Sequence, residues 1–365
     1  MSASHLHRDG PHNPFPGHRA LERRLGRALP HQLGSNEGLD MPHQALTQAL
    51  GPEVATQARR YGDAEAHRLR TLLGRRLMLD PSMLLVDAGA DSLIALALRA
   101  HCDTGATVIA SAGTYPTFRY FAEGHGCRLI EVNYRRERGL LAPDPAGLRE
   151  AAHYHRARLV YLANPDNPSG HLHDDETLEA FMASLPEGCT LLLDEAYHEF
   201  RPDTGPSAPR PGVIRLRTFS KAYGLAGLRI GYAIATPDEI ELLLKVRIHY
   251  AVSSLALEAA RIVLEHDNEM AEHVQAVIAR RERLAQRLGD AGGQVYPSAT
   301  NFIAVPLASA EQAAQVQKAL LDDGVIVHRP AHPALGDILR ISAVEAALAP
   351  SRLTALEHAL RPDRN

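Results

Sequence analysis

Three short apolar runs decide the fold: LVYL at residues 159–162, TLLL at 190–193 and VIRL at 213–216. Similar runs occur at residues 107–110, 128–132 and 230–235. Helical patterns lie between several of them, for example at residues 93–101 and 177–184. Apolar strands that alternate with helices are typical of a largely parallel sheet that is covered on both faces. We therefore predict an α/β domain that binds its ligands at the carboxyl ends of these strands.

The pattern changes after residue 250. A long charged helical stretch at residues 258–289 is followed by short strands at 301–305, 325–328 and 338–342 and by helices at 310–322 and 344–360. The sequence thus predicts three parts: an N-terminal arm at residues 1–34, a large domain at 35–250 and a small α+β domain at 251–365. Within the arm, residues 1–17 are rich in His, Pro and Ser and predict little order. Residues 20–29 predict a short amphipathic helix.

The composition excludes several classes of protein. The 365 residues include 39 Lys or Arg and 43 Asp or Glu, and this balance, without a basic run, gives no sign of nucleic-acid binding. No segment approaches the ~20 apolar residues that a membrane-spanning helix needs, so we expect a cytoplasmic protein. The three cysteines have neither the number nor the spacing of a disulfide framework or a zinc site. His5, His7 and His12 in the arm also lack the spacing of metal ligands, so we expect no metal site.

Lysine is scarce, because only three lysines occur among the 39 basic residues. One of them, Lys221, closely follows the run at 213–216, with the hydroxyl residues Thr218 and Ser220 before it and Arg229 after it. Hydroxyls and an arginine can bind an anion together. Desolvation or nearby cations lower the pKa of a lysine that acts as a nucleophile. An exposed loop lysine is the alternative interpretation.

Polar residues follow other strands of the predicted sheet in the same way. Asp194 and Tyr197 follow the run at 190–193, and Asn167 lies in the turn-rich segment after the run at 159–162. Ala90 and Asp91 open the helical pattern that continues to residue 101, where free backbone N–H groups can bind an anion. Taken alone, Asp194 could be a solvated loop acid and the turn-rich segment only a connector.

Together these segments resemble the class I/II aminotransferases, which are pyridoxal-phosphate enzymes of fold type I, and most of all their histidinol-phosphate aminotransferase branch. The resemblance covers residues 36–340, with the motifs in family order. It implies that pyridoxal 5′-phosphate is the cofactor, that Lys221 is the Schiff-base lysine and that Asp194 keeps the pyridine nitrogen protonated. The other implied cofactor contacts are Tyr197 and Asn167 at the ring 3′-oxygen, Tyr115 on the ring face, and Ala90, Asp91, Thr218, Ser220 and Arg229 around the phosphate.

The resemblance also implies a homodimer, because Tyr61 matches a tyrosine that reaches the cofactor phosphate of the partner subunit. On the substrate side, Arg340 matches the arginine that holds a substrate carboxylate, or the phosphate of histidinol phosphate. Asn36 and Asn301 match residues near the substrate, although ordinary strand structure is the alternative for Asn301. The chain departs from the family pattern at residues 328–329, where His-Arg stands in place of a frequent lone arginine. The implied substrates are small molecules: an amino donor such as glutamate and an oxo acid or oxo-phosphate.

Other functions agree with parts of this pattern. Relatives in the same branch resemble decarboxylases of phosphorylated amino acids and carbon–sulfur lyases, which keep the cofactor and change the reaction. A non-catalytic binding module of the same fold would have no need for Lys221. A nicotinamide-dependent enzyme is disfavoured because no G-x-G-x-x-G follows a strand. We therefore predict an aminotransferase, with the decarboxylase or lyase and the binding module as alternatives.

Overall fold

The computed structural model describes residues 18–34, 36–37, 39–51, 54–59, 61–137, 139–202 and 208–360. The arm segment predicted at residues 1–17, with His5, His7 and His12, lies outside these residues. Among the described helices, none combines the length and the apolar character that a membrane span requires.

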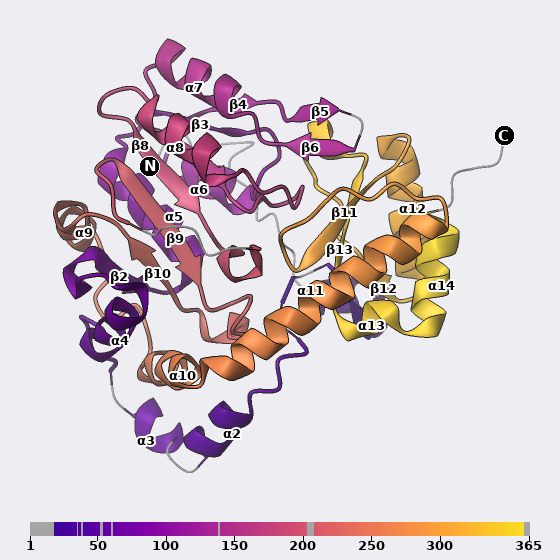
Figure 1. The fold of residues 1–365 in the computed structure, drawn as a ribbon, viewed down its shortest axis with the longest axis horizontal. Helices are drawn as coiled ribbons and strands as arrows, with labels where there is room; N and C mark the ends of the chain where they lie inside the picture. The colour runs from indigo at the N-terminus through magenta and orange to yellow at the C-terminus, as the bar shows by residue number, and fades with distance from the viewer. Residues whose placement is uncertain are drawn as a thin grey trace.

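A seven-stranded sheet forms the centre of the large domain (Figure 1), in the order β2-β10-β9-β8-β7-β3-β4. Its strands are β2 (Leu84–Asp87), β3 (Thr107–Ser111), β4 (Arg128–Val132), β7 (Leu159–Ala163), β8 (Thr190–Asp194), β9 (Val213–Thr218) and β10 (Gly231–Ile234). Strand β10 is antiparallel to both of its neighbours, and the other neighbouring pairs are parallel. The predicted α/β architecture with a mostly parallel sheet is confirmed.

The strands bury side chains on both faces of this sheet. Leu192 of β8 belongs to an apolar cluster with helices α5 (Gly89–His101) and α6 (Pro116–Gly124), whereas its neighbours Leu191 and Leu193 pack with α7 (Pro145–Tyr154) and α8 (Asp175–Ala183). Successive strand residues point to opposite faces, so a run that is apolar at every position fits a sheet with helices on both sides. Helices α4 (His67–Leu77), α9 (Pro237–Leu244) and α10 (Ser254–Glu265) cover the end of the sheet that contains β2 and β10.

A second apolar core lies at the C-terminal end of the chain. Strand β11 (Phe302–Pro306) pairs with β13 (Ile338–Ser342), and β12 (Val325–Ile326) pairs with β1 (His31–Gln32) from the N-terminal segment. These strands pack against α11 (Asp267–Asp290), α12 (Ala310–Asp322) and α14 (Pro350–Ala359). Figure 1 shows α11 extending from α10, beside the large sheet, to β11 and β13. The division at residue 250 stays a prediction.

Several predicted helices have different bounds. The stretch at 258–289 is two helices, α10 and α11, because the chain turns at His266 (φ −119°, ψ 44°). Asp267 and Glu269 in the first turn of α11 favour this second start, since acidic side chains stabilise a helix N-terminus. The stretch at 344–360 is divided into α13 (Glu345–Leu348) and α14 by Pro350, which has no N–H for a continuing helix. The helix at 20–29 is α1 (His18–Leu25), and the remaining short helices are α2 (Gln44–Leu50) and α3 (Val54–Ala58).

Candidate active site

Most of the predicted site residues line one cavity of about 590 Å³. Asp194 ends β8, Thr218 ends β9, and Asn167 follows β7, so the sheet delivers all three to the same edge. The other predicted residues that line it are Asn36, Ala90, Asp91, Tyr115, Tyr197, Ser220, Lys221, Arg229 and Arg340. Tyr61 and Asn301 are not part of the lining.

One end of the cavity is suited to an anion. Helix α5 begins at Gly89, which has a φ of 82° and could not carry a side chain easily, since a Cβ would lie 3.1 Å from Arg229 Nη2. This close approach places the guanidinium at the helix start, where the first backbone N–H groups have no partner within the helix. Arg229 Nη2 lies 3.2 Å from Asp91 Oδ2, and the hydroxyls of Thr218 and Ser220 are 2.9 Å apart in the same wall. A phosphate group fits this combination of a guanidinium, hydroxyls and helix N–H groups.

Asp194 is a buried carboxylate whose two hydrogen-bond donors do not fully offset the cost of burying its charge. Its Oδ2 accepts a hydrogen bond from Tyr161 Oη at 2.6 Å, and its Oδ1 accepts one from Ala196 N at 3.0 Å. Burial nevertheless raises the pKa of Asp194 to about 6. A cationic partner in the cavity, such as a protonated ring nitrogen, would stabilise the ionised form.

Lys221 differs from the other lysines in its surroundings. Burial and then the positive charge of Arg340 lower the pKa of Lys221 to about 8. With such a pKa, Lys221 is a neutral amine in about a tenth of the molecules at pH 7, which is a far larger fraction than for an exposed lysine. Lys245 is exposed, and Lys318 Nζ lies 2.8 Å from Asp322 Oδ2 on the surface of α12. Lys221 is therefore the lysine that is suited to nucleophilic chemistry.

Arg340 closes the other end of the cavity. The side chain is 3% exposed, and its guanidinium carbon lies 5.1 Å from the centroid of the Phe302 ring. Its Nη1 donates to Asn167 Oδ1 at 2.6 Å, and its Nη2 donates to the Gly34 carbonyl at 2.7 Å. A guanidinium has five N–H donors, so Arg340 is fixed in place and still has donors for an anion in the cavity.

The three remaining predicted residues have different positions. Asn36 lines the cavity, and its side-chain amide lies 3.1 Å from the Tyr197 hydroxyl. Asn301 supports Asn36 from behind, because its Nδ2 donates to the Asn36 carbonyl at 3.1 Å. Tyr61 is 85% exposed, with its ring centroid 5.0 Å from that of Tyr250.

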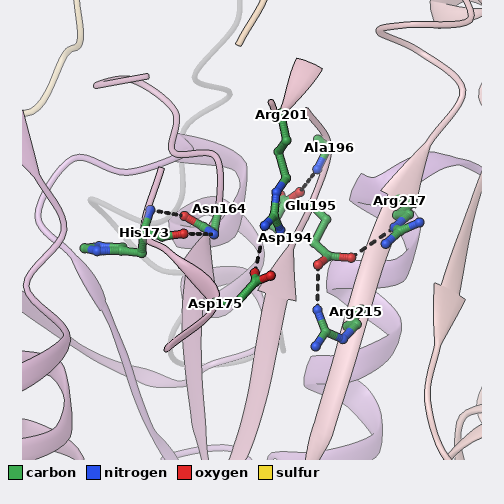
Figure 2. A network of polar contacts seen from close by, with 9 residues as sticks. All are labelled: Asn164, His173, Asp175, Asp194, Glu195, Ala196, Arg201, Arg215 and Arg217. Carbon is green, nitrogen blue, oxygen red and sulfur yellow. Dashed lines mark hydrogen bonds and ion pairs between the residues drawn. The ribbon is translucent and has the colours of Figure 1, made fainter. Parts of the chain in front are cut away.

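A buried ion-pair cluster behind Asp194 escaped the sequence analysis (Figure 2). Glu195 Oε1 lies 2.7 Å from Arg215 Nη1, and Glu195 Oε2 lies 3.0 Å from Arg217 Nε. Burial opposes ionisation of Glu195, but Arg217 and Arg215 prevail and lower its pKa to about 2. The cluster ties the end of β8 to β9 and so fixes the spacing between Asp194 and Thr218. Its signal in the sequence is two arginines at alternate positions of an otherwise apolar strand.

Comparison with known proteins identifies the family. The sequence model described as "Aminotransferase class I and II" matches residues 31–360. The chain belongs to this family. An aromatic amino acid aminotransferase from Corynebacterium efficiens is 38% identical over 316 residues, covering 84% of this chain and 87% of the relative. A histidinol-phosphate aminotransferase from Anaeromyxobacter sp. is 32% identical over 328 residues, covering 88% of each chain.

A solved structure supports the same assignment. The histidinol-phosphate aminotransferase from Sinorhizobium meliloti, in complex with pyridoxal-5′-phosphate, is 37% identical, with a TM-score of 0.88 over 95% of this aminotransferase and 94% of that chain. The predicted family, fold type and aminotransferase activity are therefore confirmed, and pyridoxal 5′-phosphate is the cofactor. The cavity of this aminotransferase fits the cofactor, because it has an anion cradle at Gly89 and Arg229 and a buried carboxylate at Asp194.

Proposed function

We propose that this aminotransferase moves an amino group from a donor such as glutamate to an oxo acid or oxo-phosphate, with Lys221, Asp194 and Tyr197 as its catalytic residues. One observation carries the proposal. A half-buried lysine of lowered pKa and a buried carboxylate of raised pKa share one cavity, between an anion cradle and Arg340. Groups whose pKa values are displaced in this way are typical of active sites.

Each residue has a task that follows from its chemistry. When bound, pyridoxal phosphate supplies an aldehyde that combines with amines and a ring that withdraws electrons. Ala90, Asp91, Thr218, Ser220 and Arg229 would hold its phosphate, Tyr115 its ring face, and Tyr197 with Asn167 its ring oxygen. The Asp194 carboxylate would hold the proton on the ring nitrogen. Lys221 Nζ can take a proton from the substrate Cα and return it, because its pKa is close to the working pH.

On the substrate side, Arg340 would bind the anionic group of the substrate, with Asn36 beside it and Asn301 behind Asn36. Arg340 Nη1 and Nη2 donate to Asn167 and Gly34, and Nε and Nη1 also lie 3.2 and 3.3 Å from the Asn36 amide oxygen in the orientation that satisfies its hydrogen bonds. A carboxylate or a phosphate would therefore bind the second N–H of Nη2 and compete with Asn36 for the other donors. The relatives that are named above act on aromatic amino acids or on histidinol phosphate, and Arg340 alone does not distinguish these two substrates.

A homodimer is part of the proposal, with Tyr61 reaching the cofactor phosphate of the partner subunit. Tyr61 is 85% exposed, and Tyr250, whose ring lies 5.0 Å from it, is 51% exposed. Large apolar side chains that gather on a surface favour a protein partner. A cytoplasmic location is also part of the proposal, and three unpaired cysteines are the usual state in a reducing compartment.

The test is a half-reaction in which the purified enzyme receives glutamate alone. We expect the visible absorbance of the bound cofactor to change as it takes up the amino group. Lys221→Ala should slow this change by about 10²–10⁴-fold, because the base that moves the proton is lost. Lys245→Ala is the matched control, since Lys245 is exposed, and it should react like the wild type.

Three results would contradict the proposal. Absence of a spectral change with every amino donor would mean that the enzyme does not accept amino groups in this way. Release of carbon dioxide or of a thiol without transfer of the amino group would favour the decarboxylase or the lyase. A Lys221→Ala variant that reacts as fast as the wild type would remove Lys221 from its role.

A further inference from the structure

His328 occupies a position next to Arg340 at the substrate end of the cavity. His328 N donates to the Arg340 carbonyl at 3.1 Å, and Arg340 N donates to the His328 carbonyl at 2.7 Å. The two residues thus form a directly opposed antiparallel pair. Side chains of such a pair leave the same face with their Cβ atoms about 5 Å apart. Both His328 and Arg340 line the cavity that contains Lys221.

The adjacent arginine, Arg329, points elsewhere. Its Nε donates to Gln317 Oε1 at 3.3 Å, and its Nη1 donates to the Gly336 carbonyl at 3.3 Å. Arg329 contributes to a neighbouring cavity of about 840 Å³ and not to the lining of the first. The chain therefore presents a histidine, and not the following arginine, beside the anion-binding group of Arg340.

The imidazole of His328 supplies no positive charge there. Burial, followed by the charges of Arg340 and Arg329, lowers the pKa of His328 well below its usual value, so the ring is neutral at physiological pH. Among the residues that the structure describes, the charged side chains that line the cavity are Glu37, Asp91, Asp194, Lys221, Arg229 and Arg340. Arg229 lies beside Asp91 at the anion cradle, and Lys221 is the reacting amine, so Arg340 is the cation left for the substrate.

We propose that His328 determines substrate specificity, by favouring a substrate with a single carboxylate on Arg340 and an uncharged, largely apolar side chain over a phosphate ester. This inference rests on the proposed function. A phosphate monoester carries a charge of about −1.5 to −2 at pH 7, which one arginine cannot neutralise, whereas a carboxylate matches it. Uncompensated charge in a buried site is costly, and Glu37 in the same lining adds to the repulsion.

The wall that the two cavities share beside His328 is suited to such a side chain, whereas charged residues, among them Arg24, Arg119, Lys318 and Arg329, line the second cavity further on. The two cavities share part of their lining, namely Leu21, Tyr115, Asn167, Ile326, Val327 and His328. Leu21, Ile326 and Val327 give the shared wall an apolar character, and the neutral imidazole can accept or donate one hydrogen bond. A substrate held by Arg340 can therefore extend an aromatic or branched apolar group along this shared wall, past His328.

The test compares two unreactive probes that share a phenyl ring and differ in their anion. The dissociation constants of 3-phenylpropanoate and 2-phenylethyl phosphate are measured by calorimetry on the holoenzyme at pH 7.5. We expect the wild type to bind the carboxylate at least tenfold more tightly. His328→Arg should reduce this preference at least tenfold by adding a second cation, and His328→Gln, which stays neutral, should keep it. Arg329→Gln should also keep it, because Arg329 points away from Arg340.

Equal or tighter binding of the phosphate by the wild type would overturn the proposal, and so would an unchanged preference in a folded His328→Arg. If His328→Arg does not fold, Arg329→Gln still decides, because a change of preference in that variant would make Arg329 the determinant. The glutamate half-reaction is recorded on the same wild-type sample. A normal half-reaction with the wrong anion preference refutes the role of His328 alone, whereas a failed half-reaction refutes the proposed function.

Discussion

The cofactor half of the cavity is formed by segments that each follow a strand of one sheet, whereas the substrate half joins distant parts of the chain. Asp194 and Thr218 end neighbouring strands whose register is fixed by the parallel pairing and by the Glu195 ion pairs. The substrate half is held by contacts such as Arg340 Nη1 to Asn167 Oδ1, which connects residues 173 positions apart.

Because of this difference, we expect the cofactor half to determine the chemistry and the substrate half to determine which substrate binds. The cofactor half is part of a sheet that is buried on both faces, so its geometry is the same whichever substrate binds. The substrate half depends on how β12, β13 and the N-terminal segment meet the sheet, and a single residue such as His328 can change it. We therefore expect changes in the cofactor half to affect all substrates equally, and changes in the substrate half to affect them selectively.

The largest effect on turnover that would test this comparison comes from Asp194→Asn. The amide keeps the shape, its one oxygen can accept from Ala196 N and its NH2 group can donate to Tyr161 Oη, but it loses the charge opposite the ring nitrogen. Removing one partner of a buried charge pair costs about 3–5 kcal/mol, so kcat should fall by roughly 10²–10⁴-fold. Steady-state kinetics with two different amino donors would measure it. Near-normal rates, or a loss of rate with only one of the two donors, would contradict the expectation that the cofactor half affects all substrates equally.

A smaller and selective effect is expected from Arg340→Lys. A lysine cannot reach both Asn167 and Gly34 and also bind an anion, because it lacks the planar guanidinium. The loss of a charged hydrogen bond, about 1.5–3 kcal/mol, should lower kcat/KM by roughly 10–10²-fold, mainly through KM. Arg329→Lys is the matched control and should leave KM unchanged. An equal loss in kcat for every substrate would place Arg340 with the chemistry and not with recognition.

The difference between the two halves also explains which site residues can be predicted from the sequence. Asp194, Asn167 and Thr218 follow apolar runs, so the local pattern makes them candidates for the ligand-binding edge of the sheet, and the resemblance to the family is needed to assign their roles. Lys221 could be found because lysine is scarce. In contrast, nothing local indicates that Asn301 supports Asn36 from behind, since this depends on how two distant segments pack.

Three further features could not be predicted from local sequence patterns, for physical reasons. The Glu195 cluster depends on strand register, because Arg215 and Arg217 could equally have faced solvent at a sheet edge. The turn at His266 depends on packing, since residues 258–289 have a continuous helical pattern and the chain bends to carry α11 toward the second core. The positions of His328 and Arg329 relative to the cavity likewise follow from the pairing with β13.

The smallest expected effect is on the free energy of unfolding. It tests whether the charge of Lys221 in the cofactor half destabilises the folded protein. In the cofactor-free protein, Lys221 has a pKa of about 8, below the value near 10.5 of an unfolded chain. Below pH 8 both states are protonated, and the folded state bears the cost of burying the ammonium group. Between pH 8 and 10.5 the unfolded state binds more protons, so stability rises with pH, and above 10.5 the cost is gone.

Lys221→Met removes this charge and should therefore stabilise the cofactor-free protein by about 2–3 kcal/mol at pH 7, and by less than about 1 kcal/mol at pH 10. Urea unfolding at the two pH values would measure both numbers. Lys245→Met, at an exposed position, is the control and should change stability little at either pH. A Lys221→Met variant that is less stable than the wild type at pH 7 would mean that Lys221 contributes to packing. The cofactor half would then carry no energetic cost from the charge of Lys221.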